Sequence, residues 1–454
     1  MNEATLEMAE VTLESPYDVS RIRKMAGFFF ASFWCILFTG AIRKWTFQHV
    51  SVLYLFQDIP IFFAYLYALS SGMFSRGFML IGMMVLSSLI LLQGLLQIVV
   101  LEHNWIVALV GFHHYLFYLP MLLIFPLCLT EKYRRDFIRW NLLLSIPMGL
   151  LVLAQAVSPT TAFINRTSEG DAMGLPGVEV ARVSGTFNHV TFFAIWLGVT
   201  FALCMGEWLL SQERRIFKSR LLLTACTFSL TLSCLISGSR QVIFLCAAAL
   251  LGALLAAFVL GSSRALLAIG GIFLLLPVGA VFTYMISPVE FNTVNERLTG
   301  SSGAADSKQR LLGSVYSFIT EPKFSLIGAG IGLGVDASHF GNVDTYQFTY
   351  ALSEADTTRN VMELGTPVGL LYVTVRLSFL LGMILLSIRI VRSGSCPHVL
   401  PVSFILFGQG YAELTRAATM TSTQVMLGYA FILGVQLYPD ASSLENFSFS
   451  DKVL

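Results

Sequence analysis

A short polar motif, Ser237-Gly-Ser-Arg240, separates two long apolar runs of the sequence. Its serines and glycine let the backbone approach a ligand closely, and Arg240 stands where the following run would begin as a helix. The N–H groups of a helix N-terminus and a guanidinium group together form an anion site, most simply for a phosphate. The alternative is that Arg240 only extends toward lipid headgroups. The Ser-Gly-Ser context exceeds what that alternative needs, so Ser237, Ser239 and Arg240 are interpreted as phosphate ligands.

A long polar stretch, Ser287–Gly369, carries most of the other residues that could do chemistry. A loop of this length without a function would be unusual. Ser307-Lys-Gln-Arg310 opens a helical pattern, and a glycine-rich run, Gly328–Gly334, follows it. The glycines predict a tight turn whose N–H groups can approach a ligand, with plain loop geometry as the alternative. Arg310 is a second candidate phosphate ligand, and an exposed surface charge is its alternative reading.

The end of this stretch, Glu354–Gly365, is rich in charge and leads into an apolar run. If it is helical, Arg359 and Glu363 lie four residues apart on one face and can pair. Glu354 and Asp356 then lie about a turn further out, where a carboxylate could take a proton from a sugar hydroxyl. The alternative is an ordinary helix start, where acidic side chains are favourable.

Histidines supply weaker candidates. His189 closes the motif Arg182-Val-Ser-Gly-Thr-Phe-Asn-His189, where it is either a base or sugar contact or simply a satisfied interfacial histidine. His339 lies in the polar stretch, and the His113-His114 pair lies inside an apolar run and is interpreted as structural or lumen-facing. No histidine or cysteine cluster has metal-ligand spacing, so we expect no metal and no other cofactor.

The elements that position these residues are predicted to be membrane helices. Only 12% of the 454 residues are charged and 56% are hydrophobic, whereas soluble domains are about 25% charged. Apolar runs near the length of a membrane span recur along the chain, which predicts an all-α polytopic bundle of about twelve spans in a lipid bilayer. The net charge of +1 gives no indication of nucleic-acid binding. The predicted spans are 25–40, 51–70, 78–101, 105–129, 141–157, 185–208, 221–236, 241–260, 266–285, 366–390, 400–411 and 418–437.

Lysine and arginine counts orient this bundle. An N-terminus inside places the cation-rich short loops in the cytosol, and an even number of spans returns the C-terminus there. The polar stretch and the span-end residues Arg43, Arg182 and Arg240 then face outward. Asp58 and Pro60 interrupt the second span, which predicts a broken or re-entrant helix there. The predicted division is a cytosolic tail at 1–24, spans one to nine within 25–286, a large, partly helical outer loop at 287–365, spans ten to twelve within 366–437, and a cytosolic tail at 438–454.

In this order, these motifs resemble the O-antigen ligase and polymerase superfamily of bacterial envelope glycosyltransferases. The resemblance covers most of the chain. The matching segments are Gly40-Ala-Ile-Arg-Lys-Trp45, Arg182-Val-Ser-Gly-Thr-Phe187, Ser237-Gly-Ser-Arg240, Arg310 followed by Gly328-Ala-Gly-Ile-Gly332, and Arg359-Asn-Val-Met-Glu-Leu-Gly-Thr-Pro-Val-Gly369.

The resemblance implies a metal-independent enzyme of GT-C-like architecture, multi-pass in the bacterial inner membrane. Such proteins take a glycan from an undecaprenyl-diphosphate-linked oligosaccharide on the periplasmic face. A polymerase passes it to another lipid-linked repeat unit, and a ligase passes it to lipid A core. A flippase and a chain-length regulator of the same pathway are the partners to expect. Ligases of this group carry a His-Asn pair where this chain has Arg359-Asn360, which favours a polymerase.

The expected chemistry assigns a role to each candidate. Arg240, Arg310 and Arg359, with Ser237 and Ser239, stabilise the diphosphate leaving group. A base among Glu354, Asp356 and, as a lesser candidate, His339 or His189 activates the acceptor hydroxyl, and Glu363 orients Arg359. Direct displacement at the anomeric carbon inverts its configuration. The remaining candidate substrate contacts are Arg43, Arg182, His189 and His339.

Two other functions stay open from the sequence. One is a ligase that moves a finished glycan to lipid or protein. The other belongs to a different class, a glycan flippase or secondary transporter. Transporters commonly show internal repeats and charges at the membrane midplane. This chain has no repeat that relates its halves, and its charges gather at one face, so glycan transfer is favoured.

Overall fold

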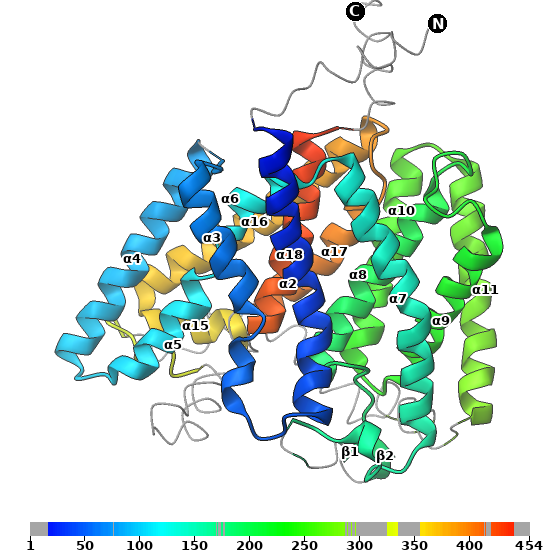
Figure 1. The fold of residues 1–454 in the computed structure, drawn as a ribbon, viewed down its shortest axis with the longest axis horizontal. Helices are drawn as coiled ribbons and strands as arrows, with labels where there is room; N and C mark the ends of the chain where they lie inside the picture. The colour runs from blue at the N-terminus through cyan, green and yellow to red at the C-terminus, as the bar shows by residue number, and fades with distance from the viewer. Residues whose placement is uncertain are drawn as a thin grey trace, which may run out of the picture.

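The computed structural model describes residues 17–75, 77–168, 170, 174–175, 178–286, 288, 292, 296, 325–334, 355–412, 414 and 419–439. Within these residues the fold is all-α apart from one small antiparallel hairpin, in which Gly174 pairs with Ala181 and Leu175 with Val178. Figure 1 shows the arrangement. The elements are α2 (Val19–Trp45), η1 (Ser51–Leu55), α3 (Asp58–Ser71), α4 (Phe78–Val100), α5 (Trp105–Leu116), α6 (Met121–Ile124), η2 (Phe125–Cys128), α7 (Glu131–Val157), η3 (Phe163–Asn165), β1 (Gly174–Leu175), β2 (Val178–Ala181), α8 (Val190–Leu209), α9 (Arg220–Ile236), α10 (Arg240–Val259), α11 (Ser263–Ile286), α15 (Asp356–Leu364), α16 (Thr366–Arg392), α17 (Val399–Ala412) and α18 (Thr419–Leu437).

Seven helical segments of the described chain are long and apolar enough to cross a membrane: α2, α4, Trp105–Cys128, α7, α8, α10 and α16. Two further apolar helices, α9 and α17, are shorter. These segments make the chain a multi-pass membrane protein. Each predicted span coincides with a helical part of the structure, and the count of twelve crossings stays a prediction.

The second predicted span is interrupted directly before Asp58, since η1 ends at Leu55 and a separate helix, α3, follows. α3 begins at Asp58, so Pro60 falls in its first turn, where a proline removes no intrahelical hydrogen bond. The fourth predicted span is also divided, because α5 ends at Leu116 and a new helix starts at Met121 after Pro120. The predicted break in the second span is therefore confirmed at Asp58, whereas Pro60 does not interrupt α3.

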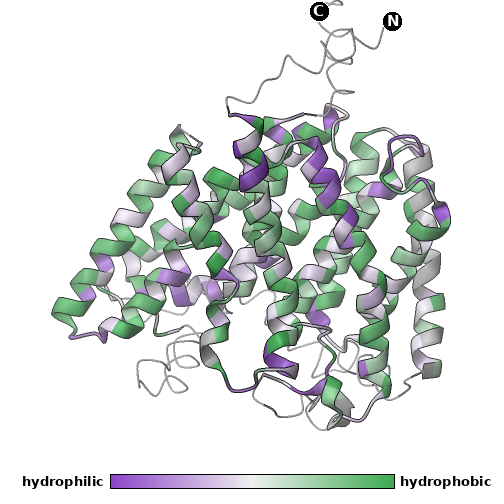
Figure 2. Ribbon diagram, viewed as in Figure 1, coloured by the Kyte–Doolittle hydropathy of each residue, from purple (hydrophilic) through white to green (hydrophobic). Residues whose placement is uncertain are grey.

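The helices run mostly side by side (Figure 1). We call the end where α2 begins and α18 ends the proximal end, and the end where the β1–β2 hairpin lies the distal end. α8 is the central helix. Its apolar membrane-length stretch is completely buried, and it packs against α10, α17 and α7. Hydrophobic residues cover most of the helix length, and hydrophilic residues gather toward the two ends and around α15 (Figure 2).

Candidate active site

α15 is a nine-residue helix enclosed by its neighbours. Eight of its nine residues are buried, and it packs against α16, α17 and α4. Gly365 has φ of +79°, and a Cβ there would come within 2.4 Å of the Leu326 carbonyl oxygen. The chain thus turns at Gly365 instead of running straight into α16. The polar side chains of α15 therefore face the interior of the bundle and not its surface.

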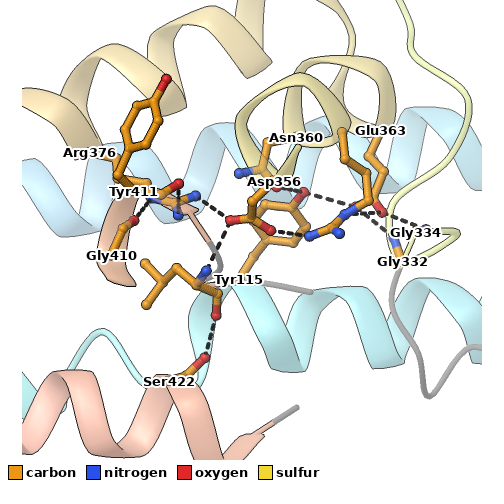
Figure 3. A network of polar contacts seen from close by, with 12 residues as sticks. Tyr115, Gly332, Gly334, Asp356, Asn360, Glu363, Arg376, Gly410, Tyr411 and Ser422 are labelled. Carbon is orange, nitrogen blue, oxygen red and sulfur yellow. Dashed lines mark hydrogen bonds and ion pairs between the residues drawn. The ribbon is translucent and has the colours of Figure 1, made fainter. Parts of the chain in front are cut away.

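Asp356 is the centre of a buried ionic network (Figure 3). One carboxylate oxygen pairs with the guanidinium of Arg359, and the other lies 2.6 Å from Nη1 of Arg376. That second oxygen also accepts a hydrogen bond from the Leu414 N–H, at 3.1 Å. Burial disfavours the carboxylate charge, but Arg359 and Arg376 outweigh it and hold the pKa of Asp356 well below its usual range. A carboxylate held this way is a weak base and a strong anchor for two arginines.

Arg376 on α16 extends this network to the end of α17. Its Nη2 donates to the Tyr411 carbonyl at 3.1 Å, and its Nε donates to the Gly410 carbonyl. Our assignment of site residues did not include Arg376. The available signal was a single arginine inside an apolar run, which is expensive in a membrane unless it has buried partners.

Glu363 is held by the glycine-rich segment. Its Oε1 accepts a hydrogen bond from the Gly334 N–H at 2.6 Å, and its Oε2 accepts from the Gly332 N–H at 3.3 Å and from the Tyr115 hydroxyl at 2.9 Å. Nε of Arg359 lies 3.7 Å from Oε1, so the predicted pairing of Arg359 with Glu363 is confirmed. Burial raises the pKa of Glu363, and the opposing influence of Arg359 is smaller.

The glycines of segment 325–334 are needed for its shape. Gly328, Gly330 and Gly332 have φ of +87°, +134° and +89°, a region that side chains rarely adopt. Gln97 on α4 fixes the same segment, since its amide oxygen accepts from the Ile331 N–H at 2.8 Å and its amide nitrogen donates to the Ile327 carbonyl at 2.6 Å. The N–H groups of Gly332 and Gly334, which could have approached a ligand, instead bind a carboxylate of the chain itself.

Ser237-Gly-Ser-Arg240 forms the predicted junction between α9 and α10. The Ser237 hydroxyl donates to the Cys234 carbonyl at 2.8 Å and accepts from the Ser239 N–H at 3.3 Å. Ser239 is the N-cap residue of α10 and is buried, and Arg240 is half-buried. The serines therefore shape the turn, and Arg240 lies at a helix N-terminus as expected.

A contact between two glutamines joins this junction to the α15 network. Gln241, next to Arg240, donates to Gln409 on α17 at 2.9 Å. Gln409 directly precedes Gly410, whose carbonyl accepts from Arg376. The phosphate candidate and the charged helix, more than a hundred residues apart in sequence, therefore belong to one region of the bundle.

Lys44 joins two further motifs at the distal end. Its ammonium donates to the Ser184 hydroxyl at 3.1 Å and to the carbonyls of Gly185 and Phe187 at 3.1 and 3.2 Å. Gly40, one turn earlier on α2, lets the same loop approach, because a Cβ there would lie 2.2 Å from the Thr186 carbonyl oxygen. The segments Gly40–Trp45 and Arg182–Phe187 thus form one packed unit.

The remaining described candidates lie beside this unit. In the amide orientation that satisfies its neighbours, Asn188 accepts from Nη1 of Arg43 at 2.9 Å. His189 is the N-cap residue of α8, and its Nδ1 accepts from the Thr191 N–H at 3.3 Å. Arg182 is half-buried, in the loop that Lys44 holds. The structure therefore gives His189 the capping role of an ordinary interfacial histidine.

The structure brings some of the expected residues together and leaves others aside. Asp356, Arg359 and Glu363 form one network, and Arg240 lies close to its far end. Arg43, Arg182 and His189 belong to the Lys44 unit. Arg310, His339 and Glu354 lie outside the described residues. Tyr115 and Gln97 were missed, since an apolar helix gives no sequence signal for which of its polar residues face a distant loop.

Within the described part of the chain, no group of three His, Cys, Asp or Glu residues could hold a metal ion. Comparison with protein family models, with curated proteins and with solved structures finds no match to this chain. By its own geometry, the site combines a rigid network of buried arginines and carboxylates with an arginine at a helix N-terminus. Such a combination can bind an anion and keep a flanking segment in a fixed position.

Proposed function

We propose that this protein is a glycosyltransferase that polymerises lipid-linked oligosaccharides at an outer membrane–water interface. The donor is an oligosaccharide on a polyprenyl diphosphate, and the acceptor is the hydroxyl of a second lipid-linked repeat unit. Inversion at the anomeric carbon follows from direct displacement of the diphosphate. The function rests on the resemblance of the sequence motifs and on their grouping in the bundle.

One observation carries the proposal. Motifs scattered over more than three hundred residues meet in two contact groups away from the proximal end. Lys44 binds the 184–187 loop, and Glu363 binds the glycine-rich segment. Gln241 then connects the Ser237–Arg240 junction to the end of α17, where Arg376 and Asp356 meet. If these residues only extended toward lipid headgroups, their motifs would not need to contact one another in this way.

The arginines divide into two roles under this proposal. Arg240 and Arg310 contact the diphosphate and stabilise the charge that develops as it leaves. Ser237 and Ser239 shape the helix start at which Arg240 lies. Arg359 is fully buried between Asp356 and Glu363, so it holds the α15 segment in place and its positive charge acts on the diphosphate at longer range.

The general base is Glu354 under this proposal. In the sequence it precedes Asp356 by two residues, and the ionic network of Asp356 fixes the start of α15. Asp356 itself has both oxygens engaged and a depressed pKa, so it is assigned to positioning Arg359 and Arg376. The periplasmic side and the bacterial inner membrane belong to the same proposal, with both termini in the cytosol.

The test is reconstitution of the purified protein with lipid-linked repeat units, followed by a gel. A ladder of products supports polymerisation. A single product that appears only with a lipid A core acceptor would instead identify a ligase, and movement of the intact donor between leaflets without transfer would identify a transporter.

The matched pair Glu354→Gln and Glu102→Gln tests the base. We expect Glu354→Gln to abolish ladders, because it removes the proton acceptor, while binding of the lipid-linked donor is retained. Glu102→Gln, in the exposed turn between α4 and α5, should leave ladders normal. Ladders of normal yield from Glu354→Gln would exclude it as the base.

A further inference from the structure

Three side chains outside the proposed glycan site form a thiol–imidazole–carboxylate array at the proximal end. Nδ1 of His398 lies 3.4 Å from Sγ of Cys396, and its Nε2 lies 3.1 Å from Oε1 of Glu207. All three side chains are buried. A nucleophile next to a base, with the base oriented by a third group, is the arrangement that activates cysteine nucleophiles.

α8 is shaped to receive the imidazole. Glu207 is at the C-terminal end of α8, and its second oxygen accepts a hydrogen bond from the Ile216 N–H at 2.8 Å, so the carboxylate is fixed. The preceding residue is Gly206, where a Cβ would lie 2.3 Å from Cδ2 of His398. The Gly206-Glu207 pair therefore provides both the space and the acceptor for His398.

The array borders a cavity of about 260 Å³. α7 contributes Glu131, Arg134 and Arg135 to its wall, and the segment after α8 contributes Arg214. Cys396, His398 and Glu207 complete the charged and reactive lining. Three arginines and two glutamates line the cavity, so its net charge is positive and favours a ligand with a negative charge.

The neighbours of His398 favour its charged form. Burial opposes the imidazolium, but the contacts with Cys396 and Glu207 outweigh it and raise the pKa of His398 to about 10. The other charged groups around it are Glu131, Arg134 and Arg135 from α7, with Arg214 and Arg215 from the segment after α8. An imidazolium beside a sulfur stabilises the thiolate, which is the nucleophilic form of cysteine.

We propose that Cys396, His398 and Glu207 form a second reactive centre, in which Cys396 takes an acyl group from a small thioester that carries a negative charge. The cavity arginines bind the anionic part of the donor, and its acyl carbon faces Cys396. This activity is independent of the proposed glycan transfer, which involves the other groups of residues described above.

The step is an acyl exchange between two sulfur atoms. Sγ of Cys396 attacks the acyl carbon and forms a new carbon–sulfur bond, while the carbon–sulfur bond of the donor breaks. The electron pair leaves on the donor sulfur, and His398 gives that sulfur its proton. Glu207 keeps the imidazole oriented throughout. No oxidant or reductant is needed.

The first measurement is the rate at which iodoacetamide alkylates Cys396 in the full-length protein in detergent, read by peptide mass spectrometry. Sγ of Cys396 lies 3.4 Å from Nδ1 of His398, so we expect Cys396 to react about tenfold faster than Cys35, the half-buried internal reference on α2. His398→Gln should lower the rate at pH 7 about tenfold, because the activating imidazole is lost, and leave it unchanged at pH 10, where hydroxide can replace the imidazole as the base.

Gly206→Ala is a second variant that displaces His398 without removing any reactive group, and it should give the same pH-dependent loss. Equal rates for the wild type and both variants at pH 7 would overturn activation by His398. An equal loss at both pH values would also overturn it, because that result indicates a structural role alone.

The second measurement tests the substrate class. Arg135→Gln should lower the rate with iodoacetate relative to iodoacetamide, because Arg135 lines the cavity. Arg139→Gln should not, since Arg139 is one turn further along α7 and is not among the residues that line the cavity. S-Acetylthioglycolate, a small thioester with one carboxylate, should acetylate Cys396 in the wild type and not in His398→Gln at pH 7. An unchanged reagent ratio in Arg135→Gln would overturn the anion preference, and rapid alkylation without acetylation would overturn the thioester assignment.

Discussion

At the scale of single residues, the described site is governed by how charge is compensated in the bundle interior. Asp356 is shared by two arginines, and Glu363 is held by two backbone N–H groups and a tyrosine hydroxyl. Removing one partner of a buried charge pair is far more damaging than replacing the whole pair, because the remaining charge loses its compensation. The roles of individual residues can therefore be separated by substitution.

Asp356→Asn should destabilise the protein by about 3–5 kcal/mol, because it leaves Arg359 and Arg376 facing a neutral amide in a buried site. The thermal unfolding midpoint in detergent measures the effect. The control is Asp136→Asn. Asp136 is half-buried and pairs with Arg139 at the surface, so this change should alter stability by less than about 1 kcal/mol. Equal midpoints for the two variants would contradict the anchoring role of Asp356.

Arg240→Ala should abolish product ladders and leave the amount of folded protein in the membrane nearly unchanged, because the side chain is half-buried at a helix start. Arg240→Lys should restore little activity, since a point charge cannot reproduce the two-pronged contact of a guanidinium with phosphate. Ladder gels and detergent gel filtration of the same preparations measure the two effects. Normal ladder length and yield in Arg240→Ala would remove Arg240 from the mechanism.

At the scale of elements, a short helix and a glycine-rich segment lock each other in place. α15 supplies the carboxylate of Glu363, and segment 325–334 supplies the N–H groups that bind it. Gln97 on α4 ties both to the bundle, because its amide also donates to the Glu363 carbonyl at 2.6 Å. The glycines are therefore structural here, since side chains would prevent both the backbone conformation and the close approach.

Gly332→Ala tests the contact between α15 and segment 325–334. Gly332 has φ of +89°, and a Cβ would lie 2.3 Å from the Val107 carbonyl oxygen, so we expect a loss of about 2 kcal/mol or more together with a loss of ladders. Gly382→Ala is the matched control, because a Cβ at that helical position of α16 meets nothing within 4 Å. It should be neutral or stabilising by up to about 1 kcal/mol. Equal stability of the two variants would show that the segment adapts freely.

At the scale of the whole molecule, the bundle separates two polar regions. The α15 network and the Lys44 unit lie away from the proximal end, and the Cys396 cavity lies at that end, where α7 begins and α8 ends. α8 connects the two regions, since His189 at its start lies beside the Lys44 unit and Glu207 near its end borders the cavity. α4 lies at the edge of the bundle, and its exposed hydrophobic residues, including Ile81, Leu92 and Val99, suit contact with lipid. Under the proposed orientation, the two regions face opposite sides of the membrane.

Reporter fusions test the proposed orientation. A periplasmic-active reporter at Ser302, within the predicted outer loop, should give signal, and the same reporter at Arg214 should not, because cation-rich short loops stay in the cytosol. Reversed signals would overturn the orientation and, with it, the use of a donor presented on the outer face. The same result at Ser302 and Arg214 would contradict the prediction that an odd number of membrane spans separates these two positions.

The sequence by itself determined the membrane class, the approximate bounds of the helices and the Arg359–Glu363 pair. These features are local: apolar runs must satisfy their backbone polar groups within a helix, and residues four apart on a helix are neighbours. Only the tertiary structure decided that Asp356 serves two arginines, that Gly332 and Gly334 bind Glu363, and that Lys44 holds a loop 140 residues away. The same is true of the contact between His398 and Glu207. Each of these contacts joins segments far apart in sequence, and the packing of whole helices, which no local pattern encodes, determines which buried polar groups meet.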